Sequence, residues 1–420
     1  MSIKIQPKSR SLSRILTSVP LIDRVSKAML CAQFKKIQHG SITIIDQNET
    51  LHFGQNEEIK VTLNIKKSSF YSRTLFGGSI GNAESYVDND WDCNNLTDLV
   101  RLFIKNREVL QKIDGGLVNL LAPLQKVFHG FRSNSLEGSR KNIRSHYDMG
   151  NEFFELFLDT SMMYSSAIFD SKTSTLEEAS LNKIKIICEK LKLKETDHLV
   201  EIGTGWGAVA IHAATQYGCK VTTTTISKEQ FEYTQAKVKS LGLENKIAVL
   251  FEDYRKLEGT YDKLVSVEMI EAVGLNNLDT YFQVCSRLLK PNGLMLLQVI
   301  TIRDHFYENA KNSVDFIQRH IFPGCGIPSV SSMLNSVTEK SDMVMIHQQD
   351  YAEDYAQTLR HWAERFTQKS DKVLDLGYPQ FLPRLWQFYF AYCEGGFRER
   401  AIGLSQIVFA KPKYKNRSLL

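Results

Sequence analysis

The sequence predicts an α/β fold, an open sheet with helices on both faces, joined to a smaller N-terminal α+β domain. Strand and helix patterns alternate from residue 176 to residue 300, which is typical of such a sheet. Residues 40–65 instead alternate apolar and polar side chains with period two, which indicates short strands. A chain of 420 residues suits two or three domains. Its 43% hydrophobic and 24% charged residues exclude collagen-like and wholly disordered chains.

The N-terminal domain is expected to mix helices with strands. Apolar residues recur at helical spacing over residues 10–32, and Pro20 divides this stretch into two short predicted helices. Asn95 is a suitable N-cap for a later helix. The other predicted elements are strands 41–45, 51–53 and 61–65 and helices 96–105 and 117–128.

A polar stretch at residues 130–146 predicts a linker, which places the N-terminal domain at residues 1–129 and a second domain at residues 147–420. The second domain carries the alternating pattern. Its predicted elements are helix 176–191, strand 198–202, helix 206–217, strand 219–225, helix 228–241, strands 247–251 and 263–267, helix 278–289, a turn at 291–293 and strand 294–300.

Charge and cysteine usage restrict the possible partners and location. The net charge is +5, yet residues 1–75 alone carry +7, so a basic end precedes a nearly neutral body. A basic end suits nucleic acid or an anionic membrane surface. Seven cysteines without a C-x-x-C pair favour a reducing compartment and no metal site. Since no apolar run approaches the ~20 residues needed to span a bilayer, we expect a cytoplasmic protein.

The strongest local motif is LVEIGTGWG at residues 199–207, a glycine-rich turn between a predicted strand and helix. By itself it also fits a tight connection without a ligand. A dinucleotide turn would have glycine at 208, where this chain has Ala208. Glu201 would repel a pyrophosphate but suits a cationic amino group. The motif therefore favours S-adenosylmethionine over NAD.

Seven motifs follow one another in a fixed order along the second domain. They are YDMGNEFF at 147–154, MYSSA at 163–167, the glycine turn, TISKEQ at 225–230, EDYR at 252–255, SVEMIE at 266–271 and GGFR at 395–398. In this order they resemble the motifs of the cyclopropane-fatty-acyl-phospholipid synthases. A further stretch, GGSIGNAESYVD at residues 77–88, extends the resemblance into the N-terminal domain. The resemblance covers nearly the whole chain and implies a Rossmann-like class I methyltransferase sheet that uses S-adenosylmethionine.

The family's chemistry is methyl transfer to the cis double bond of a phospholipid acyl chain, followed by loss of a proton that closes a cyclopropane ring. The resemblance implies a bound bicarbonate as the base. It assigns that bicarbonate to Ser166, Glu271, Gln298, Ile300 and Tyr355 and names Cys393 as a further catalytic residue.

Three positions depart from the family pattern. Ser166 replaces a usual Cys, whereas Gln298 and Ala272 each replace a usual His. Gln can donate a hydrogen bond but cannot take a proton near neutral pH. A methyl-branched or methylene product, or a catalytically weak lipid-binding homologue, are therefore alternatives. A small-molecule methyltransferase would not need the basic N-terminal domain.

The cofactor is expected across the carboxyl ends of the strands that end at residues 202 and 225. The expected partners are unsaturated phospholipids at an anionic surface, with the protein peripheral on the inner membrane face; a homodimer is an alternative. Nucleic acid is not expected, because the basic end lacks interleaved aromatics. The expected cofactor-binding residues are Tyr147, Tyr164, Ser165, Glu201, Gly203, Gly205, Trp206 and Gly207, then Thr225, Ile226 and Gln230 near the ribose, and Asp253 and Tyr254 near the adenine.

Overall fold

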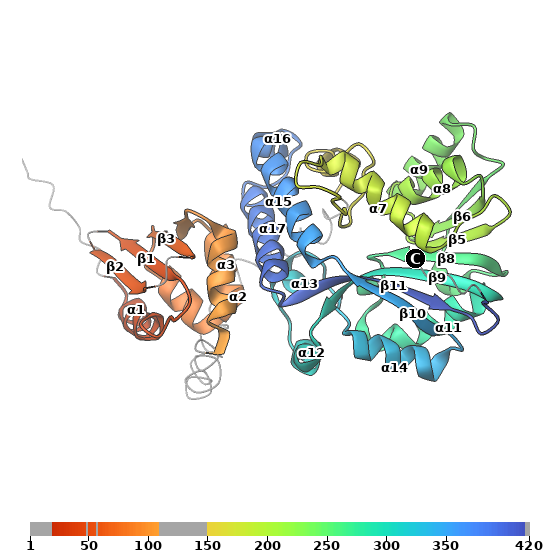
Figure 1. Ribbon diagram of the computed structural model, residues 1–420. Helices are drawn as coiled ribbons and strands as arrows, with labels where there is room; N and C mark the ends of the chain where they lie inside the picture. Colours follow the sequence, from red (N-terminus) through yellow and green to blue (C-terminus); the bar gives the residue numbers. More distant parts are fainter. Residues whose placement is uncertain (1–18, 48, 56–57, 109–148, 416–420) are drawn as a thin grey trace, which may run out of the picture.

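The computed structural model describes residues 19–47, 49–55, 58–108 and 149–415, which form a small N-terminal unit and a larger α/β unit (Figure 1). The predicted helix 117–128 and linker 130–146 lie outside the described residues, so the domain boundaries stay a prediction. No helix among the described residues combines the length and the apolar character that crossing a bilayer requires.

The N-terminal unit is a four-stranded sheet with three helices. Its strand order is β2-β1-β3-β4, and only β1 and β3 run parallel. One helix begins directly after Pro20, and the Asn95 side chain caps another by accepting from the Asp98 N–H at 3.0 Å, as predicted. The elements are α1 (Leu21–Phe34), β1 (Ser41–Asp46), β2 (Glu49–Gly54), β3 (Lys60–Ile65), α2 (Ser69–Val87), β4 (Trp91–Cys93) and α3 (Leu96–Lys105).

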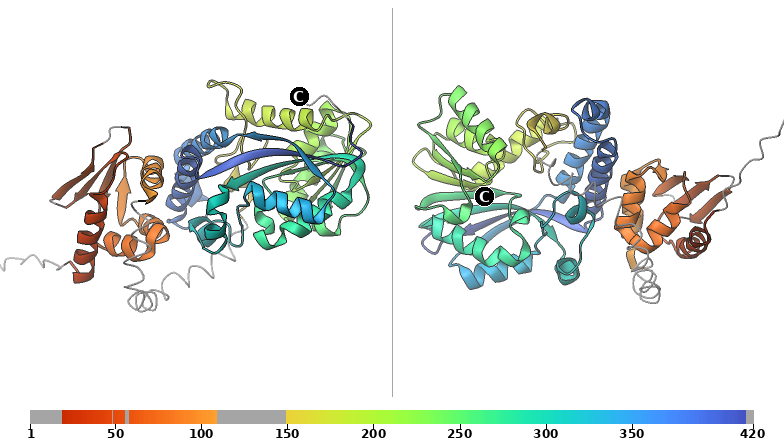
Figure 2. Two further views of the ribbon diagram at one scale, coloured as in Figure 1. Left: turned by 60° about the horizontal axis from the view of Figure 1, so that its bottom comes forward. Right: turned by 180° about the vertical axis from the view of Figure 1, so that it is seen from behind.

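The larger unit is built on a seven-stranded sheet of order β10-β11-β9-β8-β5-β6-β7, with helices on both faces (Figure 2). Strands β5 to β9 are parallel, and β11 runs antiparallel between β9 and β10. The strands are β5 (His198–Ile202), β6 (Lys220–Thr225), β7 (Ile247–Phe251), β8 (Tyr261–Val267), β9 (Leu289–Ile302), β10 (Val344–Asp350) and β11 (Ile402–Ala410).

The helices of this unit confirm the predicted alternation with the strands. The sequence patterns missed β10, β11 and the last long helix. The helices are α6 (Asn151–Phe154), α7 (Leu176–Lys190), α8 (Ala208–Gln216), α9 (Lys228–Ser240), α10 (Ile270–Val273), α11 (Leu278–Leu288), α12 (Asp304–Lys311), α13 (Phe316–His320), α14 (Val330–Lys340), α15 (Ala352–Gln368), α16 (Ser370–Asp375) and α17 (Leu382–Arg398).

The predicted turn at 291–293 is wrong as a strand boundary, because β9 already begins at Leu289. Its ladder with β8 jumps from Leu289 to Leu294, so the extra residues form a bulge inside one strand. The chain after β11 pairs with this bulge, since Lys411 N donates to Gly293 O at 3.0 Å. This pairing comes from a distant segment and left no local signal in the sequence.

Helix α17 connects the two units by packing against α2 and α3. The Arg384 guanidinium lies 3.9 Å from the centre of the Tyr86 ring and donates to the Tyr86 carbonyl at 2.7 Å. A Cβ on Gly395 would lie 2.7 Å from Val100 Cγ1, so a glycine is needed where α17 meets α3. The resulting contact combines a cation–π pair with close helix packing.

Candidate active site

The predicted glycine turn joins β5 to α8 at the carboxyl edge of the parallel strands. The N–H groups of Gly203 and Thr204 both donate to the Thr224 carbonyl of β6, at 3.1 and 3.0 Å. Gly205 has φ 52°, and a Cβ there would meet no atom within 4 Å. The turn thus offers bare backbone next to open space, which is what close approach of a ligand requires.

The other two glycines of the turn have neighbours. A Cβ on Gly203 would lie 3.1 Å from Met269, and one on Gly207 would lie 2.6 Å from Thr234. Both residues were expected to line the methionine part of the cofactor. In the structure, their lack of a side chain also allows the turn to pack against α9 and the loop after β8.

Glu201 is buried below this turn. Thr223 Oγ1 donates to Glu201 Oε2 at 2.6 Å, and Thr204 Oγ1 lies 2.7 Å from Thr223 Oγ1. Burial raises the pKa of Glu201 to about 8. Glu201 is therefore a buried acid near the end of β5, directly before the glycine turn.

The residues expected near the ribose follow β6. Thr225 Oγ1 donates to Gln230 Oε1 at 2.9 Å, and Ile226 is exposed. The Glu252 N–H donates to the Thr225 carbonyl at 3.1 Å, which ties the loop after β7 to the end of β6. The structure therefore brings these two expected loops together at the same edge.

The residues expected near the adenine lie in that second loop. Asp253 accepts from the Arg255 Nη2 at 2.6 Å, and this ion pair is the main reason that its pKa is lowered. The Tyr254 ring packs 5.7 Å from the Tyr281 ring. Asp253 would therefore have to share its carboxylate between Arg255 and a ligand.

The remaining expected cofactor residues come from the segment before α7 and, for Trp206, from the glycine turn itself. Tyr147 lies outside the described residues. Trp206 Nε1 donates to Asn151 Oδ1 at 2.7 Å, and the hydroxyl oxygens of Tyr164 and Tyr389 are 3.0 Å apart. The Phe154 ring of α6 lies 5.0 Å from the Trp206 ring, so aromatic rings stand beside the glycine turn.

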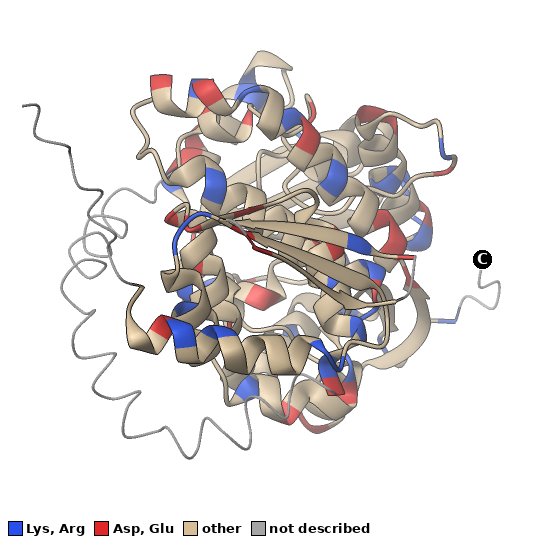
Figure 3. Ribbon diagram, turned by 90° about the vertical axis from the view of Figure 1, so that its left-hand side faces the viewer, with Lys and Arg blue, Asp and Glu red and all other residues tan. Residues whose placement is uncertain are grey.

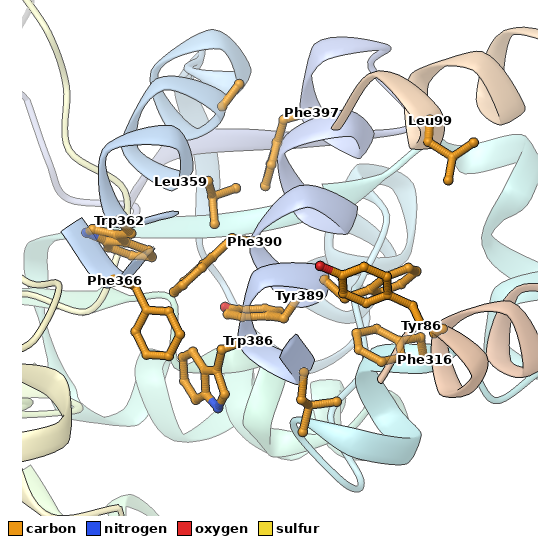
Figure 4. Close-up of a cluster of buried hydrophobic side chains, with 14 of the residues drawn as sticks. Tyr86, Leu99, Phe316, Leu359, Trp362, Phe366, Trp386, Tyr389, Phe390 and Phe397 are labelled. Atoms are coloured by element: carbon orange, nitrogen blue, oxygen red, sulfur yellow. The ribbon is translucent and has the colours of Figure 1, made fainter. Parts of the chain in front are cut away.

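These rings belong to a large aromatic cluster between α15 and α17 (Figure 4). Trp362 lies 5.3 Å from Tyr164, and Trp386 lies 5.2 Å from Tyr389, measured between ring centres. Phe322, from the segment between α13 and α14, approaches Tyr389 at 6.0 Å. Such a surface is apolar, and its ring faces can stabilise a cation.

Ser165 connects to a buried lysine that the sequence analysis did not select. Lys183 of α7 is completely buried, and its Nζ donates to Ser165 Oγ at 2.6 Å. Burial lowers the pKa of Lys183 to about 8, while the nearby Glu268, Asp159 and Glu201 raise it. Lys183 is therefore a cation placed among three buried acids.

Glu268, directly after β8, is one of these acids, and it takes two donors. Its Oε1 accepts from the Ser166 N–H at 2.9 Å and from Gln298 Nε2 at 2.8 Å. The Tyr355 hydroxyl lies near the same carboxylate and helps to lower its pKa. Burial raises the pKa of Glu268, and Lys183, Gln298, Tyr355 and the Ser166 N–H oppose the rise.

Glu271 lies close to Glu268 and binds the Ile300 N–H, a donor that the resemblance assigned to the bicarbonate. Its Oε1 accepts from the Ile300 N–H at 2.6 Å, whereas its Oε2 is buried without a hydrogen-bond partner. Burial and the charge of Glu268 raise the pKa of Glu271 to about 8. At neutral pH Glu271 is therefore mainly protonated. We refer to Glu268 and Glu271 as the carboxylate pair.

A line of polar groups fixes the orientation of Gln298. Lys190 Nζ can only donate, and it donates to Gln406 Oε1 at 2.9 Å. Gln406 Nε2 must then face Gln298 Oε1, which is 2.9 Å away. The free Nε2 of Gln298 is thereby turned toward Glu268. Lys190 and Gln406 come from α7 and β11, so no local pattern indicated this arrangement.

The structure thus brings Ser166, Glu271, Gln298, Ile300 and Tyr355 together, as the resemblance implied. These groups do not fit a bicarbonate, however, because the Ser166 N–H, Gln298 Nε2 and the Ile300 N–H already bind the carboxylate pair. A bicarbonate would also lie beside the Glu268 carboxylate. No mechanistic step below is therefore assigned to bicarbonate.

Cys393 of α17 is separate from this hydrogen-bonded set. Burial strongly raises the pKa of its thiol, so a thiolate nucleophile is disfavoured there. Among the described residues, His, Cys, Asp and Glu form no group of three or more that could hold a metal ion. The sequence analysis missed Glu268, Lys183, Lys190 and Gln406, although Glu268 stands inside a quoted motif, three residues before Glu271.

The sheet order and the glycine turn define a class I methyltransferase that uses S-adenosylmethionine. Residues 134–407 match the family model described as mycolic acid cyclopropane synthetase, and the chain belongs to this family of C-methyltransferases. The resemblance inferred from the motifs is thus confirmed.

Three comparisons illustrate the relationship. Cyclopropane-fatty-acyl-phospholipid synthase of Escherichia coli is 33% identical over 366 residues, 85% of this chain and 89% of its own. Tuberculostearic acid methyltransferase UfaA1 of Mycobacterium tuberculosis is 32% identical over 337 residues, 78% of each chain. The solved structure of mycolic acid cyclopropane synthase CmaA1, complexed with SAH and CTAB, is 28% identical with a TM-score of 0.59; the match covers 64% of this chain and 98% of that one. The family and these relatives support S-adenosylmethionine-dependent methyl transfer to a lipid.

Proposed function

We propose that the protein methylates the cis double bond of an unsaturated phospholipid acyl chain and closes a cyclopropane ring. The observation that carries this proposal is that the carboxylate pair lies beside the aromatic cluster at the cofactor edge of the sheet. An alkene is a weak nucleophile, so the site must exclude water and tolerate a carbocation. Buried acids and ring faces meet these two demands.

Different residues of the chain make room for the cofactor, orient the acyl chain and stabilise positive charge. S-adenosylmethionine supplies an electrophilic methyl group, and the backbone at Gly205 offers it room. Tyr164, Tyr389 and Phe322 form an apolar surface against which an acyl chain can be oriented. The carboxylate pair stabilises positive charge that develops on the alkene and can remove a proton.

The assay for this proposal uses purified protein, S-adenosylmethionine and vesicles of unsaturated phosphatidylglycerol and phosphatidylethanolamine. We expect S-adenosylhomocysteine and a fatty acid that has gained one CH₂ group, identified by gas chromatography and mass spectrometry against cyclopropane and methylene standards. A heat-denatured sample is the control. Turnover of a water-soluble acceptor with no lipid product would contradict the proposal.

A methyl-branched or methylene product is the second candidate. The specific observation in its favour is Gln298, which donates to Glu268 where the family commonly has His. The similarity to a tuberculostearic acid methyltransferase is compatible with it. The same assay separates the candidates by product, and cofactor binding without any methylated lipid would indicate a weakly active lipid-binding homologue.

We further propose that α1 docks the enzyme on an anionic membrane. Leu21 and Val25 are 74% and 50% exposed and lie four residues apart on one face of α1, with Arg24 between them. Many other basic residues here are ion-paired, and Lys27, for example, contacts Asp46. Figure 3 shows Lys and Arg interspersed with Asp and Glu along the helices and loops. Docking through α1 therefore depends both on insertion of Leu21 and Val25 into the membrane and on the attraction of basic residues to its anionic surface.

The double variant Leu21→Glu/Val25→Glu is expected to lower binding to anionic vesicles about tenfold or more, because each change removes apolar contact and adds repulsion. Vesicle sedimentation measures this, and wild-type binding should weaken as salt rises. Leu241→Glu, on the larger unit and 51% exposed, is the matched control. Equal binding of all three proteins would contradict docking through α1. Sedimentation velocity without lipid tests the alternative of a homodimer.

A further inference from the structure

We propose that the carboxylate of Glu268 is the proton acceptor of the reaction, in the place that the family resemblance gives to bicarbonate. The proposal deepens the proposed lipid methylation and rests on it. Three independent observations support it. They are the hydrogen-bond donors that bind the Glu268 carboxylate, the direction of the hydrogen bonds that lead from Lys190 to Gln298, and the backbone conformation of Glu268.

The first observation is the donor set. The Ser166 N–H and Gln298 Nε2 both donate to one carboxylate, that of Glu268, and the Tyr355 hydroxyl lies near it. The Ile300 N–H is bound by Glu271 in the same way. A carboxylate and a bicarbonate present the same pair of acceptor oxygens. The chain therefore supplies from its own residues the anion that these donors recognise.

The second observation is the direction of the hydrogen bonds. Lys190 Nζ can only donate, so Gln406 accepts from it with Oε1 and donates with Nε2 to Gln298 Oε1. The Nε2 of Gln298 must then donate to another group. That donor requires a permanent acceptor. Glu268 satisfies it at 2.8 Å. Glutamine at position 298 is thus matched to glutamate at position 268.

The third observation is strain. Glu268 has φ 49°, a left-handed conformation that a residue with a Cβ adopts at a cost of ~1–2 kcal/mol. Its N–H donates to the Gln298 carbonyl at 2.8 Å, which helps to hold the conformation. A strained acid beside a cofactor turn is typical of a functional residue. Lys183 and the donors to Glu268 favour the ionised form of its carboxyl group.

The chemical step balances as follows. The π electrons of the alkene form a bond to the methyl carbon as its bond to sulfur breaks, which releases S-adenosylhomocysteine and leaves a carbocation. Glu268 takes a proton from the new methyl group, and the electrons of that C–H bond form the third side of the cyclopropane ring. Glu268 ends as a carboxylic acid and returns its proton to water. No further reactant is needed.

The decisive experiment compares wild-type protein with Glu268→Gln in buffers purged of carbon dioxide and with added bicarbonate. Wild-type turnover should be the same in both. Glu268→Gln should lose about 10²–10⁴-fold in kcat, the usual contribution of a positioned base, while calorimetry shows unchanged cofactor affinity. With trideuteromethyl cofactor, the variant should show a larger isotope effect on ring closure, which a purely structural role would not produce.

Glu268→Gly provides a second variant that relieves the backbone strain and opens space for a small anion. Added bicarbonate or formate should restore part of its turnover, and combination with Gln298→His should increase that dependence. Glu394→Gln removes another buried carboxylate, one that Arg398 and Thr97 bind, and is expected to keep wild-type kinetics.

Two results would overturn the proposal: wild-type turnover that falls when bicarbonate is removed, or Glu268→Gln that keeps its kcat and isotope effect. Both results can be obtained only if the wild-type enzyme forms a methylated lipid. A wild-type protein that forms none refutes the proposed function itself, and the assignment of Glu268 with it.

Discussion

Replacing Gly205 by valine is expected to reduce the affinity for S-adenosylmethionine at least about 100-fold. Gly205 has φ 52° and faces open space at the cofactor edge of the sheet. The valine side chain would project into the volume that the methionine part of the cofactor needs. Isothermal calorimetry on the purified variant measures the effect directly.

The control for this prediction must separate lost space from backbone strain. Gly242, after α9, also has a left-handed φ, 65°, and a Cβ there would likewise meet no atom within 4 Å. Gly242→Val should therefore carry a similar strain of ~1–2 kcal/mol but keep full cofactor affinity. Undiminished affinity in Gly205→Val would refute the placement of the cofactor at this turn.

Replacing Lys183 by methionine is expected to destabilise the fold by about 3–5 kcal/mol at neutral pH, because a cation is removed from among buried acids. Lys183 is fully buried, and its charge lowers the pKa of both Glu201 and Glu268. Methionine preserves most of the apolar volume but leaves these acids and Ser165 without the cation. Urea unfolding measures the loss of stability.

The loss should stay nearly constant from pH 5 to 7 and grow only near pH 8. Burial holds the pKa of Glu201 at about 8 in the folded protein, compared with 4.5 for an ordinary glutamate. An acid whose pKa is raised by folding favours the folded state below the lower value, and this contribution is lost as pH rises toward the higher one. Between these two values both proteins lose it at the same rate. Without Lys183 the folded pKa of Glu201 rises further, so the variant continues to lose stability at the pH where the loss in the wild type begins to level off.

The same change should move the activity profile. If Glu268 must be ionised to accept a proton, removal of Lys183 raises its pKa and shifts the acidic limb of kcat to higher pH. Lys185→Met, two residues along the same helix in an exposed ion pair with Glu189, should change neither stability nor profile measurably. A Lys183→Met protein as stable as the wild type at pH 8 would contradict this account.

Local patterns predicted much of the fold because they depend on neighbours in the sequence. The period-two stretches became β1, β2 and β3, and the helix capped by Asn95 begins at Leu96 as expected. Strand β9 was misjudged, because the bulge at 291–293 is held by residues after β11. Strand pairing over such a distance depends on the tertiary structure alone.

The α/β class, the glycine turn for S-adenosylmethionine and the family could be predicted from the sequence, since each rests on residue types at fixed spacing. The family resemblance also selected Ser166, Glu271, Gln298, Ile300 and Tyr355 as a set. What the donors among these residues bind depends on the tertiary structure. Their donors come from three separate segments, the loop before α7, strand β9 and helix α15, and the line that orients Gln298 starts on α7 and crosses β11. A hydrogen bond is satisfied by whichever acceptor folding brings within reach, and here that acceptor is Glu268, a residue that no local pattern distinguishes from an ordinary acid at the end of a strand.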